Sequence, residues 1–256
     1  MNRCNIFGND TSSSIKSDET NDEYNYDLEK LKMDLYNNST LFIDRNYQGH
    51  MNYTISSSHH DAMIAALDYN QNQVAVESSP ESSRYERKFI DKMKELIDYS
   101  YSSWGYVSTG GTISNIMGLW IARDKAREER NPNRIVLTSK HAHYNIKKAC
   151  KLLYLKCKLC ECDEEGRMIL PKSFTGVLAI VPTIGTTETG TVDNLEEIIH
   201  IARKNDIYVH ADAAWGGYFL YAKDVLNEFT YKQLRMLSKC DSVTLDPHKA
   251  GYAHMV

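Results

Sequence analysis

The sequence has neither a long hydrophobic run nor a large excess of charge of one sign. Its uninterrupted apolar stretches, such as Val177–Val181, are far shorter than the roughly 20 residues needed to cross a bilayer. The first residues, Met1–Gly8, contain no apolar core of signal-peptide length. Lys and Arg number 30 against 34 Asp and Glu, which gives a net charge of −4 and no basic patch for nucleic-acid phosphates. These absences exclude an integral membrane protein, disfavour a nucleic-acid binder and predict a cytoplasmic enzyme.

A second pair of metal-binding residues is also lacking. Of the six cysteines, three lie close together in Cys157-Lys-Leu-Cys160-Glu-Cys162. A zinc site would need another C-x-x-C or a His pair at ligand spacing, and none follows. We therefore interpret residues 153–162 as a strand in which cysteine is a small apolar residue, and we expect no metal site. Without a signal peptide, disulfides are not expected either.

The amino-terminal third is polar at first and then helical. Residues 1–23 are rich in Ser, Asp and Asn and predict a disordered, solvated tail. Residues 24–80 form a second segment, with one helix predicted over 24–35 from its leucine spacing and a short one over 62–67. Ser79 and Pro80 then read as an N-cap and a first helical residue, which predicts a helix to about Ile97 and opens a domain over 81–256.

From residue 104 onward, short apolar strands alternate with amphipathic helices. This order predicts an α/β fold with a mostly parallel sheet flanked by helices. Ligands of such sheets bind beyond the carboxyl ends of the strands. The expected strands are 104–108, 134–138, 153–162, 177–181, 207–210 and 241–245, and the expected helices are 113–121, 143–153 and 194–203.

Polar residues follow several of these strands, and each has an ordinary structural explanation when taken alone. A Gly-Gly turn such as 110–111 can be purely structural, although the helix amides that follow favour an anion. Asp212 could be a turn acid, and Lys249 a solvated surface charge. His141 and His143 could be metal ligands, a helix cap or a ring stacked on a planar cofactor. Their joint placement at one sheet edge favours a ligand site.

The segments that carry these residues resemble, in order, those of the pyridoxal-phosphate-dependent decarboxylases that act on glutamate, aromatic amino acids and tyrosine. The resemblance spans about residues 45–256 and implies the large domain of fold type I, with pyridoxal 5'-phosphate as cofactor. The matching segments are Ser-Thr-Gly-Gly-Thr-Ile-Ser-Asn at 108–115, His-Ala-His at 141–143, Val-Pro-Thr-Ile-Gly-Thr-Thr at 181–187, His-Ala-Asp-Ala-Ala at 210–214 and Asp-Pro-His-Lys at 246–249.

The resemblance also implies residues around the cofactor ring. Lys249 would bind the aldehyde covalently, and Asp212 would hold the pyridine nitrogen protonated so that the ring can accept electrons. His143 would stack on one face, near the substrate carboxylate, and Ala214 would pack against the other. Thr183 would contact the oxygen substituent of the ring. Lys249, His143 and Asp212 are therefore the expected catalytic residues.

Three further residues would hold the phosphate. By the same resemblance these are Gly111, Thr112 and His248. Asp246 occupies a position where some family members carry Asn or Ser. Because a carboxylate cannot donate a hydrogen bond to phosphate, we do not include Asp246 in the expected site.

The expected activity is decarboxylation of a small-molecule L-amino acid to an amine and CO2. Residues 49–52 and 69–80 are similar to the microbial tyrosine decarboxylases, which favours an aromatic substrate over glutamate. Another amino-acid decarboxylase, a pyridoxal-phosphate-dependent aldehyde lyase and an inactive remnant stay open as alternatives. The family further implies a homodimer, with residues 24–80 helping to build the contact.

The carboxyl end departs from the family pattern. The chain stops at Val256, seven residues after Lys249, whereas relatives continue with a further strand and a small carboxyl-terminal domain. We therefore expect a fragment without that domain, with weak or no activity on its own.

Overall fold

The computed structural model describes residues 19–38 and 56–253, and it divides the chain into two units, Met1–Gln48 and Gly49–Val256. In the first unit, helix α1 spans Glu19–Asn38. The predicted helix over 24–35 is confirmed, but it begins inside the segment expected to be a disordered tail. Residues 1–18 of that tail lie outside the described residues.

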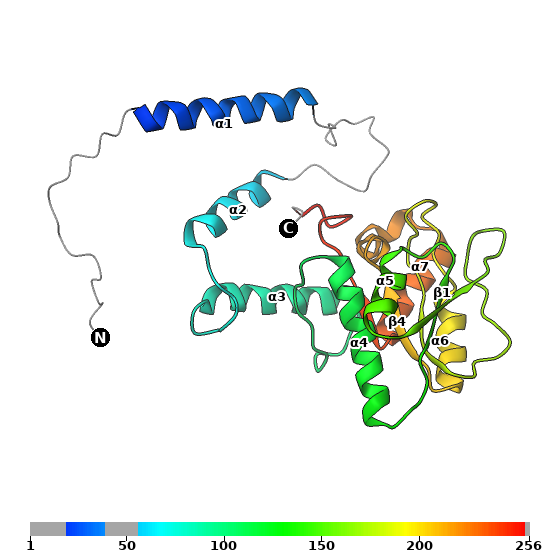
Figure 1. Cartoon of the computed structure of the whole chain (residues 1–256). Helices are drawn as coiled ribbons and strands as arrows, with labels where there is room; N and C mark the ends of the chain where they lie inside the picture. The colour runs from blue at the N-terminus through cyan, green and yellow to red at the C-terminus, as the bar shows by residue number, and fades with distance from the viewer. Residues whose placement is uncertain (1–18, 39–55, 254–256) are drawn as a thin grey trace. The chain divides into compact units, whose positions relative to one another are not determined.

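The second unit begins with helices and continues as an α/β domain (Figure 1). Its helices are α2 (Ser57–Tyr69), α3 (Pro80–Ile97), α4 (Gly111–Glu128), α5 (Asn145–Leu152), α6 (Leu195–Lys204) and α7 (Glu228–Arg235), with 3-10 helices over Gly216–Val225 and Met236–Lys239. None of the helices in the described ranges has the length and apolar character of a bilayer span.

Five strands form one sheet, in which every pairing is parallel. The order across the sheet is β2-β1-β3-β4-β5, which confirms the predicted α/β class. Parallel strands require crossover connections. Helices supply them between β1 and β2, between β3 and β4 and between β4 and β5, whereas residues 161–176 connect β2 to β3 without a helix. The strands are β1 (Ile135–Ser139), β2 (Lys156–Cys160), β3 (Val177–Val181), β4 (Tyr208–Asp212) and β5 (Ser242–Thr244).

Helices cover both faces of the sheet, and each face has its own apolar core. On one face, α4 and α5 pack against β1 and β3 through residues such as Leu119 and Ile146. On the other face, α6, α7 and the end of α3 pack against the same strands through residues such as Ile198 and Leu234. The central strand β3 is buried along its whole length, as expected for a parallel strand covered on both sides.

The structure departs from the predicted elements at three places. The strand expected over 104–108 is wrong, since this segment has no ladder partner in the part of the chain that the structure describes, and the Val107 amide donates to the Glu86 carboxylate, 2.8 Å away. The strand interpretation of the cysteine cluster is confirmed, although β2 is shorter than predicted. Ser79 stands at the N-cap of α3 as predicted, but its hydroxyl donates to the Asn72 carbonyl and accepts no hydrogen bond from a helix amide.

Candidate active site

Asp212 and Thr183 meet at the carboxyl edge of the sheet. Asp212 is the last residue of β4, and Thr183 follows β3 by two residues. The Asp212 amide donates to the Pro182 carbonyl at 3.0 Å, and the Asp212 carbonyl accepts from the Ile184 amide at 2.8 Å. Because backbone bonds on both sides of Thr183 fix this register, the two side chains are held next to each other at the edge where a ligand was expected.

The Asp212 carboxylate is buried, with 6% of the residue exposed. Its Oδ2 accepts a hydrogen bond from Asn115 Nδ2 at 2.9 Å, and its Oδ1 accepts one from the Ala214 amide at 3.2 Å. Both donors are neutral, so they orient the carboxylate without compensating its charge. A buried carboxylate of this kind is stabilised by a cationic partner, and a protonated pyridine nitrogen is such a partner.

Thr183 carries an unsatisfied hydroxyl. Its Oγ1 is buried and makes no hydrogen bond with any residue in the described ranges, whereas its backbone amide donates to Asp193 Oδ2 at 2.7 Å. A buried polar atom without a partner typically costs about 1–3 kcal/mol. An oxygen atom of a bound ligand, placed beside Asp212, would remove this cost.

The first turn of α4 supplies an anion cradle that side chains leave open. A Cβ atom added to Gly111 would lie 3.2 Å from Asp246 Oδ2 and 3.5 Å from the Ala214 Cβ, so glycine lets the backbone approach closely. Gly110, with φ of 127°, has a conformation that other residues rarely adopt. Together with the amide of Thr112, the free amides at this helix end favour a phosphate.

Asp246, which the expected site leaves out, lies beside this cradle. Its carboxylate is almost fully buried, and Oδ1 lies 2.7 Å from Nδ1 of His248. Asp246 thereby orients the ring of His248, the predicted phosphate-binding residue, so that Nε2 is directed away from the carboxylate.

The remaining predicted residues lie on neighbouring segments. His143 precedes α5, and its Nδ1 accepts the Asn145 amide at 3.3 Å. Asn145 in turn lies 3.4 Å from the Asn115 amide that contacts Asp212. Lys249 is half-buried in the turn that follows β5. The structure thus brings Thr183, Asp212 and Ala214 together with the start of α4, and places His143 and Lys249 on the flanking turns.

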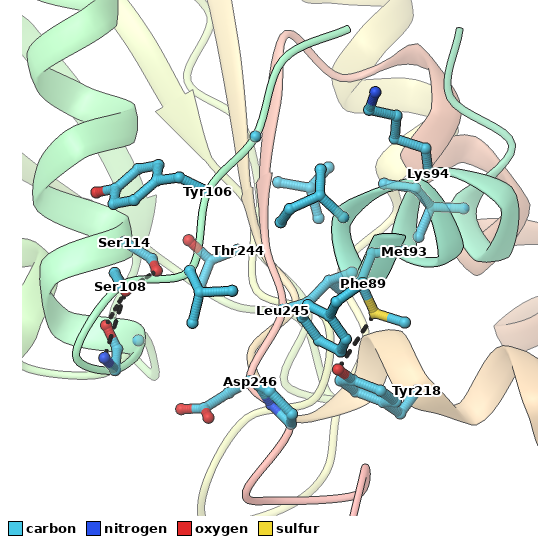
Figure 2. A pocket seen from close by; sticks show the side chains of 18 of the residues that line it. Phe89, Met93, Lys94, Tyr106, Ser108, Ser114, Tyr218, Thr244, Leu245 and Asp246 are labelled. Carbon is cyan, nitrogen blue, oxygen red and sulfur yellow. Dashed lines mark hydrogen bonds between the residues drawn. The ribbon is translucent and has the colours of Figure 1, made fainter. Parts of the chain in front are cut away.

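A cavity of about 190 Å³ borders the cradle on the side of α3. Figure 2 shows Phe89 and Met93 of α3 facing Tyr106 and Ser108 across the strand end that carries Asp246. The lining of the cavity includes Gly110 and Gly111 but neither Asp212 nor Lys249. The cavity therefore lies next to the expected phosphate position and does not enclose the reacting groups.

Comparison with known proteins agrees with this geometry. The sequence model described as "Pyridoxal-dependent decarboxylase conserved domain" matches residues 12–256. The chain belongs to this family. Family membership gives the cofactor, pyridoxal 5'-phosphate.

Relatives in the family differ in the substrates that their names give. A "Probable L-tyrosine/L-aspartate decarboxylase" of Methanothermobacter thermautotrophicus is 34% identical over 157 residues, which cover 58% of this chain and 41% of the relative. An "L-2,4-diaminobutyrate decarboxylase" of Rhizobium meliloti is 30% identical over 202 residues, covering 74% and 39%. The chain thus matches less than half the length of these relatives.

Solved structures of the family share the fold. The glutamate decarboxylase domain of a Vibrio parahaemolyticus diaminobutyrate protein superposes with a TM-score of 0.80 at 23% identity, covering 94% of this chain and 57% of that one. A tryptophan decarboxylase of Catharanthus roseus superposes with a TM-score of 0.70 at 20% identity, covering 89% and 54%. The prediction of a fold type I domain is confirmed.

The residues present fit the family's cofactor. The orphaned Thr183 hydroxyl and the uncompensated Asp212 carboxylate lie side by side, as the oxygen substituent and the protonated nitrogen of a pyridine ring require. The Gly111 cradle with His248 suits the phosphate. When bound, the cofactor supplies an electron sink for charge that develops at the substrate Cα.

Two functional candidates were missed by the sequence analysis, Asn115 and His210. Both occur in the motifs that carry the family resemblance, but neither received a role. Asn115 is buried and touches Asp212 directly. Its spacing from Gly111 and Gly118, four and three residues, places all three on one face of α4. That pattern of two glycines and an amide on one helix face was the available signal.

Proposed function

We propose that this chain carries the cofactor-binding core of an amino-acid decarboxylase, which converts an L-amino acid to an amine and CO2. The observation that carries the proposal is the buried Asp212 carboxylate beside the unsatisfied hydroxyl of Thr183. A purely structural site would satisfy the hydroxyl and pair or expose the carboxylate.

Each residue of the site would have its own role in this reaction. Lys249 would hold the cofactor through its aldehyde and exchange it with the substrate amine. Asp212 would keep a proton on the ring nitrogen, and Thr183 would donate to the ring oxygen. Gly111, Thr112 and His248 would anchor the phosphate, which fixes the ring so that the bond to the departing carboxylate can stand perpendicular to it.

The predicted ring contacts on the two faces complete this arrangement. Ala214 follows the acid by two residues and is nearly buried, and a side chain of this size leaves room for a flat ring. His143 would cover the opposite face, close to the substrate carboxylate. Its Nδ1 accepts a backbone amide, so any proton on the ring is carried by Nε2.

The favoured substrate is an aromatic amino acid, with tyrosine first. This preference rests on residues 69–80 and on residues 49–52, the latter outside the described residues. Relatives named for tyrosine and aspartate support tyrosine and make aspartate the second candidate, because an "Aspartate 1-decarboxylase" of Aliivibrio fischeri is also 30% identical.

Assembly and location belong to the same proposal. A homodimer with residues 24–80 in the contact is supported by α2, which buries none of its residues and leaves Ile64 and Leu67 exposed. Large exposed apolar residues of this kind are typical of a surface that another chain covers. A cytoplasmic location stays a prediction.

Cofactor binding and CO2 release test the proposal. The chain should acquire the yellow absorbance of the bound cofactor, and borohydride should fix it covalently. Lys249→Ala should abolish fixation, whereas the exposed lysine variant Lys204→Ala should not. CO2 release from tyrosine, aspartate and glutamate, measured on this chain and on the longest polypeptide that its gene encodes, identifies the substrate. An aldehyde product without CO2 indicates a lyase, and absence of fixation contradicts the proposal.

A further inference from the structure

We propose that Asn115 and His210 are positioning residues that hold the Asp212 carboxylate ready for the ring nitrogen of the cofactor. The inference rests on the proposed function, because it concerns the residues that hold Asp212, the proposed partner of the ring nitrogen. Neither residue would touch substrate or the reacting atoms. Both would act through Asp212.

The four side chains involved form a continuous chain of hydrogen bonds from β5 to the end of β4. Ser242 Oγ lies 2.7 Å from His210 Nδ1, and His210 Nε2 lies 3.0 Å from Asn115 Oδ1. Asn115 Nδ2 then donates to Asp212 Oδ2 at 2.9 Å. Asn115 is fully buried and His210 is 1% exposed, so water cannot replace these contacts.

The chain of bonds admits one assignment of protons. An ionised carboxylate can only accept, so the amide nitrogen of Asn115 must face Asp212. The amide oxygen therefore faces His210 and requires a proton on Nε2. His210 Nδ1 is then free to accept from the Ser242 hydroxyl. Every donor meets an acceptor, and each side chain fixes the orientation of the next.

The hydrogen-bonded series Ser242–His210–Asn115–Asp212 is called the relay below. Its histidine is neutral, and that state suits the proposed role. Complete burial lowers the pKa of His210, against an opposing effect of the nearby Asp212 charge. A positively charged His210 would already compensate the carboxylate through Asn115. With His210 neutral, Asp212 keeps its full negative charge for the ring nitrogen.

The relay also fixes the geometry of the carboxylate. Asn115 binds Oδ2, while the Ala214 amide binds Oδ1 from the other side. Held at both oxygens, the group cannot rotate when the cofactor is absent. A preorganised carboxylate of this kind loses little freedom on pairing with the ring, which favours binding of the protonated nitrogen.

A structural role alone would account for the burial but not for the target of the relay. The buried amide of Gln233, by contrast, serves the backbone: the residue is 1% exposed, and its Oε1 accepts the Glu196 amide at 2.9 Å. Asn115 instead directs its amide nitrogen at a functional carboxylate. The two residues therefore provide a matched pair, one buried amide at the site and one remote from it.

The test compares two ligands, pyridoxal phosphate and its analogue in which carbon replaces the ring nitrogen. The ratio of their dissociation constants, measured by equilibrium dialysis, reports the contact with Asp212 and needs no turnover. The original chain should prefer pyridoxal phosphate. In Asn115→Leu, which is close to isosteric, this preference should fall about tenfold or more, as expected for loss of a hydrogen bond to a charged group.

A control variant and two contrary results complete the test. Gln233→Leu should lower stability yet leave the preference unchanged. Asn115→Ala, which adds no bulk, gives the same measurement if the leucine variant does not fold. An unchanged preference in a folded Asn115 variant overturns the inference and leaves the proposed function intact. Equal, weak binding of both ligands by the original chain contradicts the proposed pairing of Asp212 itself.

Discussion

Gly118 of α4 lies directly against the imidazole ring of His210 on β4. A Cβ atom at residue 118 would lie 2.8 Å from Nε2 and closer still to Nδ1 and Cε1. Glycine in the middle of a helix costs about 1 kcal/mol relative to alanine. The chain nevertheless has glycine here, since any side chain would displace the histidine that orients Asn115. The helix therefore accepts a local cost to let the β4 ring fit against it.

Gly118→Ala should destabilise the protein in spite of the better helix propensity of alanine. Overpacking of a well-packed core costs about 1–3 kcal/mol, which exceeds the gain of about 1 kcal/mol from propensity. Urea unfolding of the variant should show a lower free energy of unfolding, and cofactor affinity should fall with it because His210 has moved. Lys125→Ala, at an exposed position of the same helix, is the control and should stay within about 0.5 kcal/mol of the original chain. A stabilised Gly118→Ala would show that the ring has room to move.

His210 should make stability depend on pH. Burial lowers the pKa of its imidazole to about 4, from an ordinary value of 6.5. Because the folded state disfavours the proton, the stabilising contribution is complete above pH 6.5 and is lost as the pH falls towards 4. A shift of this size corresponds to about 3 kcal/mol.

Urea unfolding of the original chain and of His210→Asn at a series of pH values between 7 and 4 measures this contribution. The original chain should lose more free energy of unfolding over this interval than the variant does. Other groups titrate in both proteins and cancel in the difference. Parallel profiles would mean that His210 takes up its proton in the folded state as readily as in the unfolded one.

The order of the elements could be predicted from the sequence, and so could the edge of the sheet at which the candidate site lies. Val177–Val181, a purely apolar run, coincides with β3, because a strand buried on both faces has no polar alternation to blur its ends. Asp212 was expected at the carboxyl end of a strand, and it is the last residue of β4. In both cases the local sequence carries the information.

The support behind the site could not be predicted in the same way. The bond from Asn115 to Asp212 joins residues 97 positions apart, and its existence depends on how α4 lies across the sheet. The segment 104–108 failed for a related reason, since its Val107 amide finds a side-chain acceptor on α3 in place of a neighbouring strand. Both contacts join elements that are far apart in the sequence.

Asp212→Asn should separate cofactor binding from folding. An asparagine can accept from Asn115 with its oxygen, but its amide nitrogen then faces the Ala214 amide, which is also a donor. The mismatch should cost about 1 kcal/mol of stability. Loss of the ionic partner of the ring nitrogen should cost more, about 3–5 kcal/mol in affinity for the protonated cofactor.

Isothermal calorimetry with pyridoxal phosphate, combined with thermal unfolding, checks both parts of the Asp212→Asn prediction. The exposed acid variant Asp206→Asn controls for the general loss of a negative charge and should bind the cofactor normally. Unchanged affinity in Asp212→Asn would remove this residue from the site.

The effect of Thr183→Val on stability should depend on whether the cofactor is present. Without cofactor, the substitution removes a buried hydroxyl that has no partner and should stabilise the chain by about 1 kcal/mol. With cofactor, the lost hydrogen bond to the ring oxygen should reduce the stabilisation that binding provides.

Thr138→Val is the matched control, because the Thr138 hydroxyl is equally buried but donates to the Val181 carbonyl at 2.9 Å. That variant should be destabilised by about 1 kcal/mol and should show the same cofactor-induced shift in melting temperature as the original chain. If Thr183→Val instead behaves like Thr138→Val, the Thr183 hydroxyl already has a partner and does not await a ligand.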